Sequence, residues 1–436
     1  MLKRKILCFP GLLVVLLICF AAASGVGFSA TEPVSLRFSW WGTAPRHEAT
    51  LQAISVYEKM HPNVKITGEY QGNAGYQQKI MTQLAGGTAP DIIQYDYMWM
   101  QSVTAIEDDF FDFKSTKDTN LSQWPKNILD SFCTVHGRVV GLPMGTTTDG
   151  AIIIKSFFNK YHLPFKQQYT WDWLISEGKK IHDAHPDDYL VGYDPIDSTW
   201  SDDFITAMIY SQTGKYWATD KDKKLNVSRA DILKAFTLLN NLFTSGAFMP
   251  MAAASPYTTK IVNSPDVLNG HIGMLLDGAS FVQNLEALLP KGAVTVAKPC
   301  LNSDAVNKTI YIKPALLAGV NNHSKNRNEA VKFLSWFLTS EKAAVIMKDL
   351  RATPMAKTPL RVCQKQNLLN PNITTMTKWA LQNPSEPVPL CIYDSQMLTM
   401  LGDICRNLGF KVVTPEQATD QLIKGANARL EELRKL

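Results

Sequence analysis

Two adjacent tryptophans, Trp40 and Trp41, end a strand-like run that begins at Leu36. Arg46 and His47 follow a few residues later, where an amphipathic helix is predicted to begin. Large flat rings at the carboxyl end of a strand lie where α/β proteins place their ligand crevices. We therefore predict a binding site here, in which one ring could belong to the core and the other could form a platform for a ligand.

Further aromatic residues recur at predicted strand ends and in loops, several of them with a charged residue nearby. They are Tyr95, Tyr97, Trp99, Trp200, Phe281 and Tyr393. A pyranose ring has an apolar C–H face that stacks on an aromatic ring, and hydroxyl groups that need polar partners. The pattern therefore indicates a carbohydrate ligand, although any one of these rings is equally well explained as a half-buried core residue.

The sequence contains none of the common catalytic or phosphate-binding signatures, such as G-x-x-x-x-G-K-[ST] or G-x-S-x-G. A glycosidase would need two opposed carboxylates. The available candidates are Asp96, Asp149, Asp202, Asp203 and Asp277. Nothing in the sequence selects a pair, so we predict that the protein is not an enzyme. A secreted polysaccharide-active lyase or hydrolase is the alternative, and a surface adhesin is a third interpretation.

One segment has the composition of a metal site. His182 and His185 are three residues apart and are followed by Asp187 and Asp188. Imidazoles at this spacing can share one face of a helix. Pro186 ends any helix there, however, and the segment is very polar, which favours a solvated helix end. We expect no metal site and no cofactor.

The first 30 residues are predicted to be a signal peptide. Basic residues 3–5 precede the mostly apolar segment 6–19, and small residues 21–25 follow. An uncleaved membrane anchor is the alternative, but the Pro10-Gly11 break disfavours it. The protein is therefore expected to be exported, to the periplasm or to the outer face of the cytoplasmic membrane.

Composition narrows the choice of partners further. Three of the 44 basic residues lie in the predicted signal peptide, which leaves 41 basic against 39 acidic residues. So small a net charge argues against a nucleic-acid partner. The five cysteines that follow the signal are too scattered for a disulfide scaffold, and a single bridge such as Cys363 to Cys391 stays open.

Hydrophobic periodicity predicts alternating strands and helices behind the signal. Strands are expected at 36–40, 64–67, 91–95, 272–276 and 311–320, and helices at 48–60, 75–85, 228–245, 328–338 and from Thr414 onward. Such alternation implies mostly parallel sheets covered by helices. A mature chain of about 400 residues is also too long for one core and suggests two lobes. The polar segment 145–150 is a predicted crossover between them.

With these features, the chain resembles the family-1 extracellular solute-binding proteins of ABC sugar importers, over nearly its full mature length. The resemblance is carried by segments 39–42 with Arg46-His47, 86–93, 141–143, 158–163, 242–250 and 328–334. The chain departs from the usual pattern at 153–155, at His162, and at 279–281, where a tryptophan is common. Residues 351–354 replace a commonly glycine-rich turn.

The resemblance implies an α/β fold of two lobes, the periplasmic-binding-protein fold, with a ligand cleft between the lobes. Each lobe would be a mostly parallel sheet flanked by helices. We expect residues 34–143 with 302–350 to form the first lobe and residues 146–299 with 353–436 to form the second. The crossovers between them are expected at 143–149, 298–302 and 350–354.

The implied function is the capture of a sugar or oligosaccharide and its delivery to an ABC permease by a monomer. The Trp-Trp-Gly and Arg-His pattern is similar to that of oligogalacturonide binders, so Arg46 or His47 would meet an acidic sugar carboxylate. A solvent-facing helix terminus and a neutral ligand remain the alternatives. The expected ligand-binding residues are Trp40, Trp41, Arg46, His47, Tyr76, Tyr95, Asp96, Trp99, Thr147, Trp200, Asp277, Gly278, Phe281, Arg351 and Tyr393.

Overall fold

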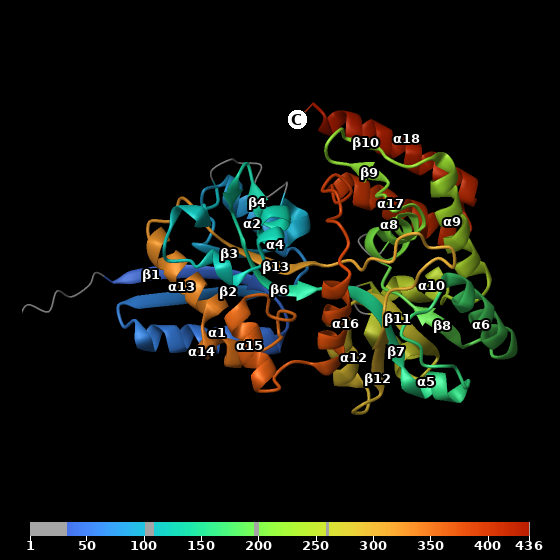
Figure 1. The fold of residues 1–436 in the computed structure, drawn as a ribbon, viewed down its shortest axis with the longest axis horizontal. Helices are drawn as coiled ribbons and strands as arrows, with labels where there is room; N and C mark the ends of the chain where they lie inside the picture. The colour runs from blue at the N-terminus through green and yellow to red at the C-terminus, as the bar shows by residue number, and fades with distance from the viewer. Residues whose placement is uncertain (1–32, 101–108, 196–199, 259–260, 436) are drawn as a thin grey trace, which may run out of the picture.

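The structure is a computed structural model that describes residues 33–100, 109–195, 200–258 and 261–435. The described chain forms two lobes that lie side by side, each built around its own sheet (Figure 1). This arrangement confirms the predicted two-lobed α/β fold. The predicted signal peptide, residues 1–30, lies outside the described residues and stays a prediction.

The first lobe contains a five-stranded sheet covered by helices. The strand order is β2 (Val64–Gln71), β1 (Val34–Trp41), β3 (Ile92–Tyr95), β13 (Lys313–Val320) and β6 (Leu142–Thr147). The helices of this lobe include α1 (Ala44–Met60), α2 (Tyr76–Ala85), α4 (Lys126–Phe132), α13 (Arg327–Thr339), α14 (Glu341–Met347) and α15 (Lys357–Lys365). Two segments far apart in the chain, 34–147 and 313–365, therefore build one core.

The second lobe contains a four-stranded sheet in the order β12 (Val294–Ala297), β7 (Asp149–Ile154), β11 (Ile272–Gly278) and β8 (Tyr189–Gly192). Its helices include α5 (Lys155–Lys160), α6 (Trp171–Ala184), α8 (Thr206–Thr213), α9 (Arg229–Thr244), α12 (Ser280–Leu288), α16 (Pro371–Gln382), α17 (Ser395–Gly409) and α18 (Pro415–Leu433). A two-stranded ribbon of β9 (Ala218–Thr219) and β10 (Lys224–Leu225) lies beneath α18.

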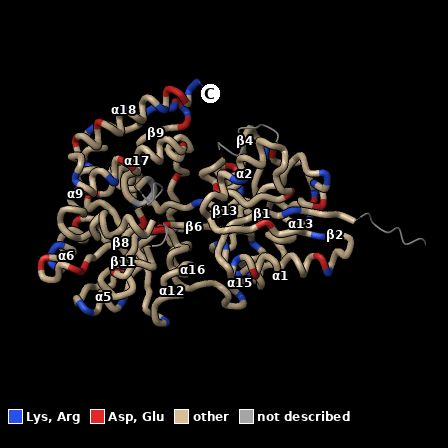
Figure 2. The backbone as a smooth tube through the Cα atoms, turned by 180° about the vertical axis from the view of Figure 1, so that it is seen from behind, with Lys and Arg blue, Asp and Glu red and all other residues tan. Residues whose placement is uncertain are grey.

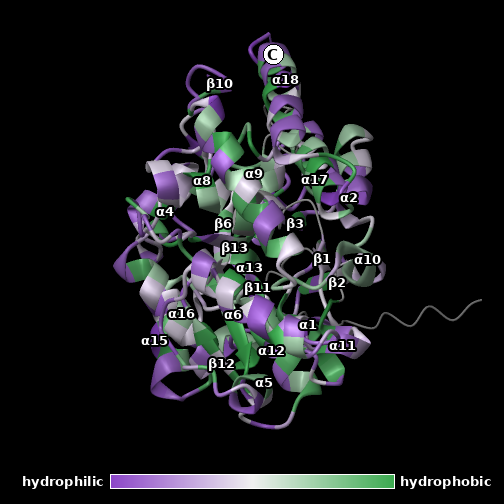
Figure 3. Ribbon diagram, turned by 90° about the vertical axis from the view of Figure 1, so that its right-hand side faces the viewer, coloured by the Kyte–Doolittle hydropathy of each residue, from purple (hydrophilic) through white to green (hydrophobic). Residues whose placement is uncertain are grey.

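Local sequence signals explain where several of these helices begin. Thr170 caps α6, as predicted, through a hydrogen bond from the backbone N–H of Trp173. The predicted capping box of α18 is confirmed, because Thr414 and Gln417 bond each other's backbone N–H groups. Helix α18 carries both hydrophobic and hydrophilic residues (Figure 3), and its buried residues Ala418, Leu422, Ala426 and Leu430 recur on one face of the helix.

The expectation of mostly parallel sheets is wrong for the second lobe and only half right for the first. In the second sheet β7 runs antiparallel to both β11 and β12, and only β8 pairs parallel with β11. In the first sheet β13 runs antiparallel to β3 and β6. The cause is the path of the chain between the lobes. Strands β7 and β13 each start at the lobe boundary, whereas their neighbours end there, so the pairs are antiparallel.

The predicted crossovers also need correction at two of the three places. The first passage falls between Thr147, the end of β6, and Asp149, the start of β7. The second lies just before Lys313 instead of at 298–302, because Ile310 and Ile312 still pack against α16 in the second lobe. The third falls at 366–370 instead of 350–354, because α15 packs on α14 whereas α16 packs on β12.

Charged residues of both signs are distributed over both lobes (Figure 2). All five cysteines after the signal are buried, and Cys363 and Cys391 are both free thiols, so the bridge considered between them does not form. No helix among the described residues combines the length and apolarity needed to cross a membrane.

Candidate ligand-binding cleft

A cleft of about 1100 Å³, open to solvent, lies where the two sheets face each other. The first lobe lines it with Trp41, Arg46, Asn73, Asp96, Met98, Trp99, Thr147, Lys313, Ala315, Leu316, Arg351 and Ala352. The second lobe and the crossover segments add Asp149, Asp277, Gly278, Ser280 and Tyr311.

Strand ends account for most of this lining. Trp41, Asp96, Thr147 and Asp277 lie at the carboxyl ends of β1, β3, β6 and β11, where a sheet edge faces a crevice. Asp149 and Lys313 lie instead at the amino ends of β7 and β13. Both of those strands start at the lobe boundary, so their first residues meet the same cleft.

The two tryptophans have different environments. The Trp40 ring is fully buried, tilts against Phe38 at 4.9 Å and donates its Nε1–H to Nδ1 of His47 at 3.0 Å. Trp41 is 7% exposed and lines the cleft. Its ring lies 4.9 Å from that of Trp99, which also lines the cleft. Because neighbouring residues of a strand point to opposite faces, only one of two adjacent rings reaches the cleft.

Two arginines form the cationic part of the first-lobe wall. Arg351 is 5% exposed; its Nε donates to Oε1 of Gln94 at 3.0 Å and its Nη2 to Oγ1 of Thr50 at 2.9 Å. Arg46 is half-buried and donates to the carbonyl oxygens of Leu350 at 2.9 Å and Trp41 at 3.3 Å. All of these acceptors are uncharged.

The backbone is shaped to hold these arginines. A Cβ on Gly42 would lie 2.5 Å from Cδ of Arg46, so the arginine stem fits only over a glycine. A Cβ on Gly145 would lie 2.4 Å from the carbonyl oxygen of Arg351, where β6 receives the 351–353 segment. These two glycines therefore allow the chain to approach closely enough to place both guanidinium groups at the cleft.

Burial lowers the pKa of both guanidinium groups. Desolvation brings the pKa of Arg46 to about 10, and desolvation followed by repulsion from Arg46 sets the pKa of Arg351 well below its usual value. Both shifts show that the charged forms are poorly solvated. Among the described residues, neither arginine forms an ion pair. A bound anion would supply the missing countercharge.

The remaining wall is mixed in charge. Lys313 is buried and lies 3.7 Å from a carboxylate oxygen of Asp96, with its Nζ over the rings of Tyr311 and Tyr393 at 5.9 and 5.8 Å. Asp149 and Asp277 bring carboxylates from the second lobe. The cleft thus offers cations on one side and acceptors on the other.

The structure brings eight of the predicted site residues together at the cleft, and they are Trp41, Arg46, Asp96, Trp99, Thr147, Asp277, Gly278 and Arg351. Tyr76 lies one layer behind, with its ring 5.0 Å from that of Trp41. Tyr393 is also behind the wall, and its hydroxyl bonds that of Tyr311 at 2.6 Å. Phe281 is half-buried on α12 and does not line the cleft.

Four predicted contacts are wrong in position. Trp40 and Trp200 are fully buried core residues, and Trp200 packs against Tyr193 and Phe204 inside the second lobe. Tyr95 is also fully buried, with its hydroxyl bonded to a carbonyl oxygen of Val140. His47 lies between Trp40 and Tyr70 and does not line the cleft. The pattern of apolar residues in the sequence does not indicate which of these rings are buried in the core.

Three of the residues that were missed share one position. Asp149, Tyr311 and Lys313 all lie at or just before the amino end of a strand that leaves a crossover. The signal that points to them is the crossover itself, since a strand that begins at a lobe boundary begins at the cleft. Asn73, Met98, Ser280, Ala315, Leu316 and Ala352 complete the set.

Comparison with known proteins agrees with this architecture. Residues 43–344 match the family of bacterial extracellular solute-binding proteins. The match covers more than half of the chain, and the chain therefore belongs to that family. An uncharacterized ABC transporter extracellular-binding protein from Pyrococcus horikoshii is 30% identical over 141 residues, which is 31% of this chain and 32% of that protein. The match thus spans about a third of that relative's length.

Solved structures with the same fold cover almost the whole chain. A periplasmic solute-binding protein from Pectobacterium atrosepticum is 22% identical with a TM-score of 0.84, covering 92% of this chain and 99% of that one. A periplasmic oligogalacturonide-binding protein from Yersinia enterocolitica, in complex with saturated digalacturonic acid, is 22% identical with a TM-score of 0.82 and the same coverage. At this identity the likeness establishes the two-lobed fold.

Proposed function

We propose that the protein is the extracytoplasmic binding component of an ABC transporter and that it captures an acidic saccharide in the cleft. The observation that carries the proposal is the pair Arg46 and Arg351, whose described partners are uncharged, beside the Trp41 ring. A guanidinium fork suits a sugar carboxylate, and an indole suits the apolar face of a pyranose. The oligogalacturonide-binding protein of the same fold supports this ligand class.

Transport requires that ligand binding changes the orientation of one lobe relative to the other. The three crossover segments before Asp149, before Lys313 and at 366–370 would act as the hinge, and residues on both sides of the cleft would grip the ligand. The ligand would favour the closed form only if it binds that form more tightly than the open one. The closed form would then dock, as a monomer, on a membrane permease outside the cytoplasm.

Isothermal titration calorimetry with galacturonic acid, digalacturonic acid, galactose and maltose tests this ligand class. We expect measurable binding for the two acidic sugars and at least about tenfold weaker binding for the neutral ones, a difference of about 1.4 kcal/mol. Equal or tighter binding of the neutral sugars would overturn the acidic preference. Chromatography of the digalacturonic acid and maltose mixtures tests the enzyme alternative, since monosaccharide products would show that the protein cleaves its ligand.

A matched pair of variants separates the site from general charge effects. Arg46→Gln removes a cation from the cleft, whereas Arg229→Gln removes one that pairs with Asp420 on the surface of the second lobe. Only the first is expected to weaken binding of digalacturonic acid. Equal losses in both would show that net charge, not the cleft, governs affinity.

A further inference from the structure

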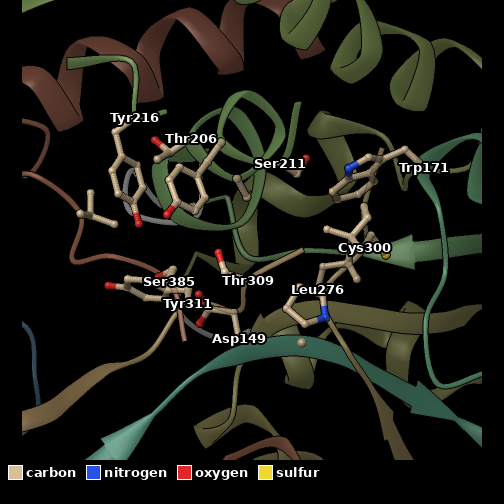
Figure 4. Close-up of a pocket in the computed structure, with 16 residues that line it drawn as sticks. Asp149, Trp171, Thr206, Ser211, Tyr216, Leu276, Cys300, Thr309, Tyr311 and Ser385 are labelled. Atoms are coloured by element: carbon tan, nitrogen blue, oxygen red, sulfur yellow. The ribbon is translucent and has the colours of Figure 1, made fainter. Parts of the chain in front are cut away.

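A second cavity lies inside the second lobe and adjoins the cleft. We call it the side chamber; its empty volume is about 690 Å³, and the residues in Figure 4 line it. Asp149 and Tyr311 line both the side chamber and the cleft, so the two spaces share a wall.

The walls of the side chamber combine aromatic rings with hydroxyl groups. Tyr210 and Tyr216 stack at 4.1 Å with an angle of 11° between their planes, and Trp171 contributes a third ring. The hydroxyl-bearing side chains are Thr206, Ser211, Thr309 and Ser385. Figure 4 shows Tyr216 and Thr206 facing Tyr311 and Asp149 across the space. This is the mixture that a pyranose needs, with rings for its C–H face and oxygens for its hydroxyl groups.

The tyrosine stack is held rigidly by the neighbouring loop. The hydroxyl of Tyr216 donates to the carbonyl oxygen of Glu386 at 2.5 Å, and the hydroxyl of Tyr210 accepts from the backbone N–H of the same residue at 3.4 Å. The wall is therefore in place before a ligand arrives. A ligand that stacks there would not have to order these side chains, which lowers the entropic cost of binding.

Trp171 supplies an unused polar group to this wall. The side chain is buried, and its Nε1–H has no hydrogen-bond acceptor among the described residues. An unpaired buried donor costs free energy until an acceptor reaches it. Because this atom has almost no accessible surface, a sugar hydroxyl oxygen would reach it only after the indole ring shifts.

The charge of the side chamber differs from that of the cleft. Among the described residues, Asp149 is the one charged residue in its lining, and no described lysine or arginine lines it. A carboxylate placed there would be desolvated without a cation and repelled by Asp149. The side chamber therefore disfavours a uronic acid and favours an uncharged sugar.

We propose that the side chamber is a second sugar subsite that binds an uncharged pyranose joined to the acidic unit held by Arg46 and Arg351. This inference rests on the proposed function, because the acidic unit anchors the ligand in the cleft. The preferred ligand is then a mixed saccharide of one uronic acid and one neutral sugar, not a chain of uronic acids alone.

Calorimetry with three probes tests the inference: galacturonic acid, digalacturonic acid and galacturonosyl-rhamnose. We expect galacturonosyl-rhamnose to bind at least about tenfold more tightly than the other two, the scale of one aromatic stacking contact. Ala207 lines the side chamber on α8 and is half-buried, so Ala207→Phe fills the space without removing a polar contact. This variant is expected to lose the tenfold advantage and to bind galacturonic acid as the wild type does. Ala207→Ser, which leaves the space open, is the matched control.

Three results would overturn the inference or its basis, and they are distinguishable. If the wild type binds galacturonosyl-rhamnose no better than galacturonic acid, the side chamber is not a sugar subsite. If Ala207→Phe is folded by thermal unfolding and keeps the advantage, the neutral sugar lies elsewhere. If none of the acidic probes binds, the proposed function itself fails. The wild-type comparison decides the matter even if the variant does not fold.

Discussion

Each lobe buries a charged side chain, and the two charges differ in the partners that surround them. In the second lobe Asp188 is 3% exposed and is held by Nζ of Lys160 at 2.6 Å, Nδ1 of His271 at 2.6 Å and the hydroxyl of Tyr161. In the first lobe Arg351 is 5% exposed and, among the described residues, bonds only uncharged groups.

The difference separates a structural charge, Asp188, from the charge that we propose binds the ligand, Arg351. Burial alone would raise the pKa of Asp188, but its three hydrogen bonds and Lys160 bring that pKa down to about 2. The charge is thus stabilised by the fold. Desolvation and repulsion from Arg46 lower the pKa of Arg351, so the fold opposes its charge. A charge that the fold opposes, at the wall of a cleft, is consistent with the proposed anion site.

The largest expected effect is the loss of ligand affinity when Arg351, the arginine bonded only to uncharged described groups, is replaced. Arg351→Gln should weaken binding of digalacturonic acid by about 100-fold or more, or about 3 kcal/mol, because a charge-assisted hydrogen bond to the ligand is lost. Binding of neutral sugars should change much less. Calorimetry on wild type and variant checks both expectations, and an equal loss for both ligand classes would mean that Arg351 only supports the cleft wall.

Replacement of Asp188, the carboxylate that the fold pairs with Lys160, should affect the stability of the fold instead of ligand affinity. Asp188→Asn should lower the free energy of unfolding at pH 7 by about 2 kcal/mol, because hydrogen bonds to an ionised group are lost. Because the folded pKa is depressed, the carboxylate stabilises the fold above its unfolded pKa near 4 and loses that contribution as pH falls through about 2.

Urea unfolding at several pH values measures this difference. The gap between wild type and Asp188→Asn should be constant above about pH 5 and should close between about pH 4 and pH 2. Ligand affinity of the variant at pH 7 should be unchanged. A gap that persists at pH 2 would mean that packing, not charge, explains the loss of stability.

A smaller effect is expected from the indole of Trp41, which lines the cleft. Trp41→Ala should weaken saccharide binding by about 1–2 kcal/mol, the scale of one stacking contact. Trp40→Phe is the matched control, since it keeps a ring in the core and loses only the hydrogen bond to His47. The control should unfold more easily and bind normally. Normal binding by Trp41→Ala would remove that ring from the site.

The smallest effect concerns the carboxylates of the second lobe. Asp277→Asn removes a negative charge from the wall that faces the arginines, so acidic sugars should bind more tightly by about 0.5–1 kcal/mol at low salt. Raising the ionic strength should shrink that gain. A loss of affinity for the acidic sugar would show that Asp277 accepts hydrogen bonds from the ligand and that this contact outweighs its charge.

Much of the fold was predictable from local patterns. Alternating apolar runs located β1, β2 and β11, and residues such as Thr170 and Thr414 marked helix starts, because strand and helix periods and caps depend on neighbours in the chain. The order of short motifs indicated the family, and the family match over residues 43–344 confirms it.

The sequence by itself therefore determined which elements form and that a ring pair and an arginine stand at a strand end. Only the tertiary structure decided that Trp40 enters the core while Trp41 reaches the cleft. It also decided that Arg351, 305 positions beyond Arg46, lies beside it with no acidic partner in the part of the chain that the structure describes. It also decided that the cleft gathers the amino ends of β7 and β13. These outcomes depend on contacts between segments distant in the chain, where packing and desolvation override local preference.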